Sequence, residues 1–207
     1  MNRQDKLYDE VGFMKRKIDL KRDGKRLFDA CIKLAKKSDC DKRKFGSLVV
    51  SKQLIMLSTF EPRKLTPGVR GLGYNHIIRG LENFNCCKER ASIASGTRTE
   101  YCGAIHAEMM ALQYALPNHF LGDNEPEIVF VAGLNGDGSF FNNSGGFYCL
   151  PCAKELAHAG IKKIALASAD TPKSGEWVYV TIEEALQQSL EFTKGTKKVD
   201  YDAGFGR

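Results

Sequence analysis

Apolar residues recur along the chain with two different spacings, and these spacings predict its helices and strands. Between Lys25 and Lys37 they fall every three or four residues, which indicates an amphipathic helix. Similarly spaced apolar positions within residues 1–22 predict an N-terminal helix. The remaining helices are predicted over residues 106–116, 152–159 and 182–192.

Runs of β-forming residues predict the strands. Residues 45–50 and 54–60 are separated by the polar pair Ser51-Lys52, which predicts a hairpin. We expect residues 61–73 to form a loop, because they include two prolines and three glycines. Further strands are predicted over residues 127–132, 161–167 and 177–180. Strands that alternate with amphipathic helices predict an α/β fold, a three-layer α/β/α sandwich around one mixed sheet.

The length of 207 residues suits one well-packed domain with extensions. We expect a helical extension over residues 1–22, a main domain over 23–193 and a mobile tail over 194–207. Residues 133–146 are rich in Gly, Asn and Ser and are expected to form a surface insertion in the main domain.

The composition is typical of a globular protein, with 43% hydrophobic and 27% charged residues. No apolar run is long enough to cross a bilayer, and no apolar stretch follows the charged N-terminus as it does in a signal peptide. We therefore expect a cytoplasmic protein without a membrane partner. The net charge is +6, with basic residues crowded between Lys15 and Lys44. Such a surface attracts nucleic acid or a small phosphorylated substrate, or is simply a solvated helix face.

The chain contains seven cysteines, an odd number in a sequence without a secretory signal. This pattern argues against a disulfide framework and favours metal ligation. Cys31 lies on the apolar stripe of its helix and is expected in the packed core.

Two short segments carry the candidate chemistry. The segment Ala-Ile-His-Ala-Glu contains His106 and Glu108, and Cys-Leu-Pro-Cys contains Cys149 and Cys152. Three protein ligands leave a fourth position of a zinc ion open to water, and a nearby carboxylate can move protons to and from that water. Taken alone, the cysteine pair is also typical of structural zinc, and His106 is compatible with a core histidine.

The ordered combination resembles the H-x-E and P-C-x-x-C signature of zinc-dependent deaminases, although Tyr148 stands where that signature has proline. Residues 38–50, 73–75 and 153–164 are similar to segments of deoxycytidylate (dCMP) deaminases, and Asn85-Cys86-Cys87 resembles a feature of their bacteriophage members. The similarity extends over about residues 25–167.

This resemblance implies a cytidine deaminase-like fold, a zinc ion held by His106, Cys149 and Cys152, and Glu108 as the proton shuttle. It implies a homo-oligomer that hydrolyses a small-molecule nucleotide, most directly dCMP to dUMP and ammonia. It also makes Asn75 a substrate contact, for which the alternative is a turn residue.

Bacteriophage members can carry a second, structural zinc. The resemblance makes Cys40, Cys86 and Cys102 candidate ligands for it, although the family's additional histidine ligand has no counterpart here. Four basic residues are candidates for binding the substrate phosphate, and the sequence selects none of them: Arg79, Lys88, Arg90 and Arg98.

Two other interpretations stay open. The same zinc chemistry serves deaminases of cytidine, of a modified deoxycytidylate or of tRNA adenosine, so nucleic acid remains an alternative substrate. The second interpretation is a non-catalytic zinc-binding domain of the same fold. Glu108 favours an enzyme, because structural zinc does not require that carboxylate.

Overall fold

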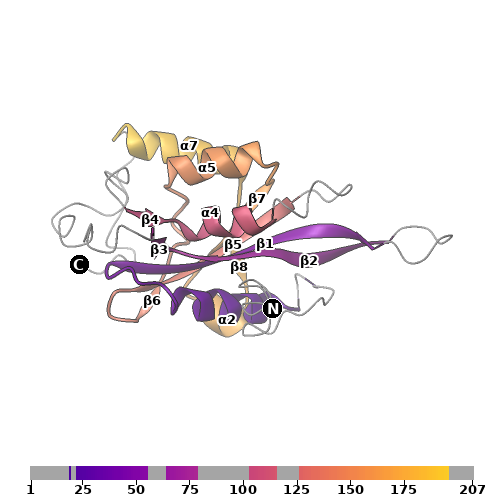
Figure 1. Cartoon of the computed structure of the whole chain (residues 1–207), viewed down its shortest axis with the longest axis horizontal. Coiled ribbons are helices and arrows are strands. Elements are labelled where there is room, and N and C mark those ends of the chain that lie inside the picture. The colour runs from indigo at the N-terminus through magenta and orange to yellow at the C-terminus, as the bar shows by residue number, and fades with distance from the viewer. Residues whose placement is uncertain (1–18, 20–21, 56–63, 79–102, 116–125, 196–207) are drawn as a thin grey trace.

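The computed structural model describes residues 19, 22–55, 64–78, 103–115 and 126–195. Helices cover both faces of a central mixed sheet, as Figure 1 shows, and this confirms the predicted α/β/α sandwich. Within these ranges, no helix combines the length and the apolar character that crossing a bilayer requires.

The predicted helices over residues 25–37, 106–116, 152–159 and 182–192 correspond to α2, α4, α5 and α7. The short elements α6, β3, β4 and β6 were not predicted. In chain order the elements are α2 (Gly24–Ala35), β1 (Arg43–Ile55), β2 (Lys64–Tyr74), β3 (His76–Ile77), β4 (Ala104–Ile105), α4 (Ala107–Ala115), β5 (Pro126–Asn135), β6 (Phe140–Phe141), α5 (Leu150–His158), β7 (Lys163–Ala167), α6 (Thr171–Ser174), β8 (Trp177–Thr181) and α7 (Ile182–Thr193).

The main sheet has the strand order β2-β1-β5-β7-β8, and β6 pairs with β5. Strands β5 and β7 are parallel, and the other neighbours are antiparallel. Helix α5 lies in the connection between the two parallel strands, since parallel strands need a crossover rather than a hairpin.

Each central strand is buried on both faces. In β1, Leu48 and Val50 belong to one apolar core, and Val49 belongs to the other. The first core lies between the sheet and α2. The second lies on the opposite face, between the sheet and the helices α4, α5 and α7 (Figure 1). This double burial explains why the strands are continuous apolar runs rather than alternating patterns.

The predicted hairpin over residues 45–50 and 54–60 is wrong. Residues 43–55 form one strand, β1, whose antiparallel partner is β2. The pair Ser51-Lys52 does not turn the chain but lies beside two register shifts, one with β2 between Val49 and Val50 and one with β5 between Val50 and Ser51. Two polar residues at a bulge resemble a two-residue turn in sequence, and only the cross-strand pairing distinguishes them.

The predicted loop over residues 61–73 is wrong for residues 64–73, which belong to β2. Because β2 lies at the edge of the described sheet, a strand position there tolerates Pro67. A Cβ added to Gly71 or Gly73 would lie 1.9 or 2.1 Å from a backbone carbonyl oxygen of α4. These two glycines therefore permit a close helix–strand contact instead of a loop.

The segment 133–146, expected to be a surface insertion, includes parts of the sheet and of its core. The end of β5 pairs with β6 inside this segment, and both Phe141 and Asn143 are buried. The segment is rich in Gly, Asn and Ser and includes a tight turn at Gly138, whose φ is 86°. The expectation of a surface position is therefore wrong for the buried residues.

Other predictions concern residues outside the described ranges. Of the N-terminal extension, the structure describes Asp19 and Arg22, and of the tail it describes Lys194 and Gly195. The helical extension and the mobile tail stay predictions.

The contact between α2 and β1 gives a stability test. A Cβ on Gly46 would lie 1.9 Å from the carbonyl oxygen of Cys31 and 2.8 Å from the Cβ of Leu34. We expect Gly46→Ala to lower the free energy of unfolding by about 1–3 kcal/mol or more, because the core must shift to accept the methyl group. Urea unfolding measures this difference.

The matched control is Gly145→Ala, whose added Cβ meets only the Tyr148 hydroxyl, at 3.9 Å. This variant should unfold at nearly the same urea concentration as the unaltered protein. Equal midpoints for both variants would contradict the close packing of α2 on β1.

Candidate metal centre

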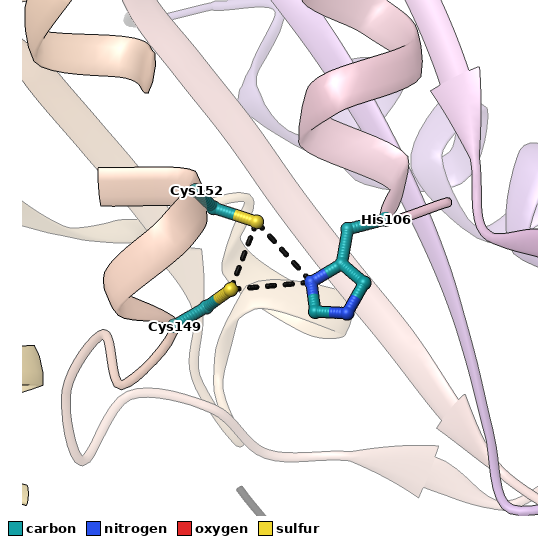
Figure 2. Close-up of side chains that lie close together, drawn as sticks. All are labelled: His106, Cys149 and Cys152. Atoms are coloured by element: carbon teal, nitrogen blue, oxygen red, sulfur yellow. Dashed lines mark hydrogen bonds between the residues drawn. The ribbon is translucent and has the colours of Figure 1, made fainter. Parts of the chain in front are cut away.

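Two helix starts meet on one face of the sheet. His106 directly precedes α4, and its carbonyl accepts the backbone N–H of Met110 in the first helical turn. Cys149 is the N-cap of α5, and Cys152 follows within the first turn. Pro151 suits this position because the first helical turn needs no hydrogen bond from its nitrogen. The three side chains point toward one another from the two helices, as Figure 2 shows.

The ligand atoms of these residues form a compact triangle. The Nδ1 atom of His106 lies 3.2 Å from the Sγ atom of Cys149 and 3.2 Å from that of Cys152. The two sulfur atoms are 2.9 Å apart. Within the described part of the chain, these three residues are the group of side chains arranged to hold a metal ion. The structure thus brings together the three ligands predicted from the sequence.

The donor set fits zinc. Two thiolates and one imidazole suit zinc and other soft divalent ions, and three protein ligands leave one tetrahedral position for water. Two sulfur atoms bound to a tetrahedral zinc ion at about 2.3 Å lie about 3.8 Å apart. Because the two sulfurs are now 2.9 Å apart, metal binding requires them to separate by about 1 Å.

The two cysteine thiols have very different pKa values. The hydrogen bond from the Cys152 thiol, helped by His106, lowers the pKa of Cys149 to about 5. The pKa of Cys152 is raised well above its usual value, because its thiol donates that bond and is buried. The pair therefore holds one thiolate at neutral pH, and metal binding would release the remaining thiol proton.

Glu108 lies in the first turn of α4 and is 7% exposed. Burial raises the pKa of this carboxyl, the neighbouring Cys149 thiolate raises it further, and His106 opposes both effects. Glu108 is therefore electrostatically coupled to the triad. A carboxyl whose pKa is moved toward neutrality can both accept and return a proton.

Asn75 is buried, and its amide is used by the backbone of β1. The Oδ1 atom accepts the N–H of Phe45 at 2.6 Å, and Nδ2 donates to the carbonyl of Arg43 at 2.8 Å. This bonding ties the end of β2 to the start of β1. The predicted substrate contact of Asn75 stays a prediction, and the described contacts are structural.

The stretch that contains Asn75 nevertheless runs beside the metal-binding residues. His76 pairs with Ile105, the residue before His106, in the short ladder between β3 and β4. Gly73 lies against the carbonyl of Ala107. No local pattern predicts this ladder, because a strand of two residues has no recognisable periodicity.

The remaining candidate residues are distributed between the core and the residues outside the described ranges. Cys31 is fully buried, as predicted for a core residue, and its thiol donates to the carbonyl of Phe130. Cys40 is also buried, and its N–H donates to the hydroxyl of Ser38. The residues outside the described ranges are Cys86, Cys102, Arg79, Lys88, Arg90 and Arg98. The second metal ion and the phosphate contacts therefore stay predictions.

Comparison with known proteins assigns no family to this centre. The chain matches no protein-family model, and no curated protein matches it.

The triad predicts the metal content of the protein. We expect each of His106→Ala, Cys149→Ser and Cys152→Ser to remove one equivalent of metal per chain, because each removes one of three ligands. Elemental analysis after gel filtration measures this loss. Cys31→Ala is the control, since that thiol lies in the core, and unchanged metal content in all four variants would refute the site.

The unequal cysteines predict a pattern of alkylation. In metal-free protein at neutral pH, iodoacetamide should modify Cys149 faster than Cys152, because the thiolate is the nucleophile. The rate at Cys149 should fall only as the pH drops through about 5. Peptide mass spectrometry follows both residues, and a midpoint near that of an ordinary thiol would contradict the shared-proton arrangement.

Proposed function

We propose that this chain is a zinc-dependent hydrolytic deaminase of a cytosine nucleotide, most directly of dCMP. The observation that carries the proposal is Glu108, a buried carboxyl coupled to His106 and Cys149 at the start of α4. Burying a carboxyl costs free energy, and a structural zinc site gains nothing from it. A site that transfers protons requires such a group.

The proposed reaction replaces the exocyclic amine of the base by oxygen. When bound, zinc supplies a water molecule whose pKa is lowered toward neutrality. Glu108 accepts one proton of that water and delivers it to the ring nitrogen as the oxygen bonds to the base carbon. It then accepts the second proton from the hydroxyl on that carbon and delivers it to the amine, whose bond to the carbon breaks as ammonia leaves. The carboxyl returns to its starting state, so water and the cytosine nucleotide yield the uracil nucleotide and ammonia.

The environment of Glu108 supports both proton transfers. A carboxyl at its ordinary pKa is a weak base and would hold a proton too briefly to return it to the substrate. Burial, against the opposing effect of His106 and with a smaller contribution from Cys149, raises the pKa, which strengthens the base. The same burial limits exchange of the proton with bulk water.

The choice of a cytosine nucleotide rests on the similarity of residues 38–50 and 73–75 to dCMP deaminases. Asn75 lies in a stretch that runs beside the start of α4, which supports a position near the metal-binding residues. Since β1 uses one Nδ2 hydrogen and one lone pair of Oδ1, a contact with substrate would use the remaining hydrogen or lone pair.

The proposal includes a compartment and an assembly. Thiolate ligands require reduced cysteines, which favours the cytoplasm. The resemblance to dCMP deaminases favours a homo-oligomer.

Ammonia release tests the proposed reaction. The purified protein is incubated with dCMP, cytidine, dCTP or a tRNA anticodon stem, each with and without a zinc chelator. We expect turnover of dCMP that the chelator abolishes. Turnover of another of these substrates would support hydrolytic deamination and correct the proposed substrate. Absence of ammonia release from all four, with zinc bound, would contradict the proposal.

Glu108→Gln separates catalysis from metal binding. We expect unchanged zinc content and a loss of turnover of at least about 10²–10⁴-fold, because the amide cannot accept the proton. Glu155→Gln, at an exposed position of α5, is the control and should retain full turnover. Equal activity of the two variants would remove Glu108 from the mechanism.

A further inference from the structure

The segment that carries the Cys149 ligand has no regular structure of its own. Residues 142–149 lie in neither a helix nor a strand. Cys149 itself has an extended backbone, with φ −96° and ψ 94°, whereas Cys152 lies inside α5. The helix thus fixes Cys152. At Cys149 it holds the carbonyl, which accepts the N–H of Ala153 at 2.9 Å, and the segment before Cys149 holds the other side of the residue.

Helix α7 holds that segment by two neighbouring side chains. The Oε1 atom of Gln188 accepts the backbone N–H of Phe147 at 3.0 Å. The hydroxyl of Ser189 donates to the backbone carbonyl of Phe147 at 2.9 Å. Phe147 is 4% exposed and Ser189 is fully buried. Both polar backbone groups of a buried residue, two positions before Cys149, are therefore satisfied by α7.

The residues on either side of Phe147 also lie against α7. A Cβ on Gly146, whose φ is 141°, would lie 2.7 Å from both the Gln188 Oε1 atom and the Tyr148 hydroxyl. The Tyr148 ring packs on Phe192 of α7 at a centroid distance of 5.2 Å, and its hydroxyl donates to the carbonyl of Gly145. Side chains of α7 thus contact the segment from Gly146 to Tyr148.

Helix α7 is itself well anchored. Thr181 and Glu184 form a reciprocal capping box at its start. Ile182 and Ala185 are buried in the same apolar core as Cys152. A capped helix that shares a core with α5 is a stable support for a ligand that α5 does not fully fix.

We propose that Gln188 and Ser189 are positioning residues that act through Phe147 to hold Cys149 in its metal-binding place, an inference that rests on the metal site of the proposed function. Neither side chain is a metal ligand in the triad. Groups that orient metal ligands in this way typically change metal affinity by about 10–100-fold when they are removed.

The test compares four variants of the full chain. Ser189→Ala and Gln188→Ala remove one hydrogen bond each, and Gln188→Glu keeps an oxygen acceptor for the Phe147 N–H. Gln187→Ala is the matched control, because this exposed side chain bonds only to Glu191 in the described contacts. Competition with a chromogenic chelator measures Zn²⁺ affinity, the thiolate-to-cobalt absorption of Co²⁺-loaded protein reports the cysteine ligands, and thermal unfolding of metal-free protein verifies folding.

We expect Ser189→Ala and Gln188→Ala to weaken Zn²⁺ binding by about 10–100-fold, and Gln188→Glu and Gln187→Ala to stay within about twofold of the unaltered protein. The cobalt–thiolate absorption should weaken in the same two variants. If Ser189→Ala does not fold, the Zn²⁺ affinity of Gln188→Ala decides, because Gln188 is half-buried rather than fully buried.

Folded Gln188→Ala that binds Zn²⁺ as tightly as the unaltered protein would overturn the inference, as would an equal loss in Gln187→Ala. Unaltered protein that binds no metal would overturn both this inference and the proposed function. Affinities in the expected order without ammonia release would contradict the proposed function alone.

Discussion

Helix α4 lies directly on the backbone of β2, because Gly71 and Gly73 have no side chains to hold it away. A Cβ on Gly73 would lie 2.1 Å from the carbonyl oxygen of Ala107, the residue after His106. This contact fixes the start of α4 on the sheet and hence the position of the imidazole. Helix α5 reaches the same face as the crossover between the adjacent parallel strands β5 and β7. The convergence of the two helix starts thus follows from sheet topology and one close contact.

The electrostatics of the site follow from this convergence. One imidazole, two cysteines and one carboxyl lie close together, so His106 and Cys149 shift the pKa of Glu108, and Cys152 and His106 lower that of Cys149. Without metal, the hydrogen bond between the two sulfurs lowers the pKa of Cys149 and so stabilises its thiolate. A divalent cation would take over that role and offset the charge of both sulfurs. The raised pKa of Glu108 reflects its burial first.

The parts of the fold that were predictable are those whose signals are local. Helices α2, α5 and α7 follow from apolar spacing and end residues, and the metal triad follows from ligand types at short spacing within two segments. Strand β2 was not predictable, because its glycines and proline have the composition of a loop and gain meaning only beside α4 and the sheet edge. The bonds of Asn75 to β1 and of Gln188 to Phe147 span 30 and 41 residues, and no local pattern indicates either.

The central claim is a metal ion held by His106, Cys149 and Cys152 with one coordination position left for water. X-ray absorption spectroscopy at the zinc edge, on protein loaded with one equivalent, tests this directly. We expect two sulfur scatterers at about 2.3 Å and two nitrogen or oxygen scatterers at about 2.0 Å, one of which is exchangeable. A shell of three or four sulfurs would indicate a closed structural site and would refute an open coordination position.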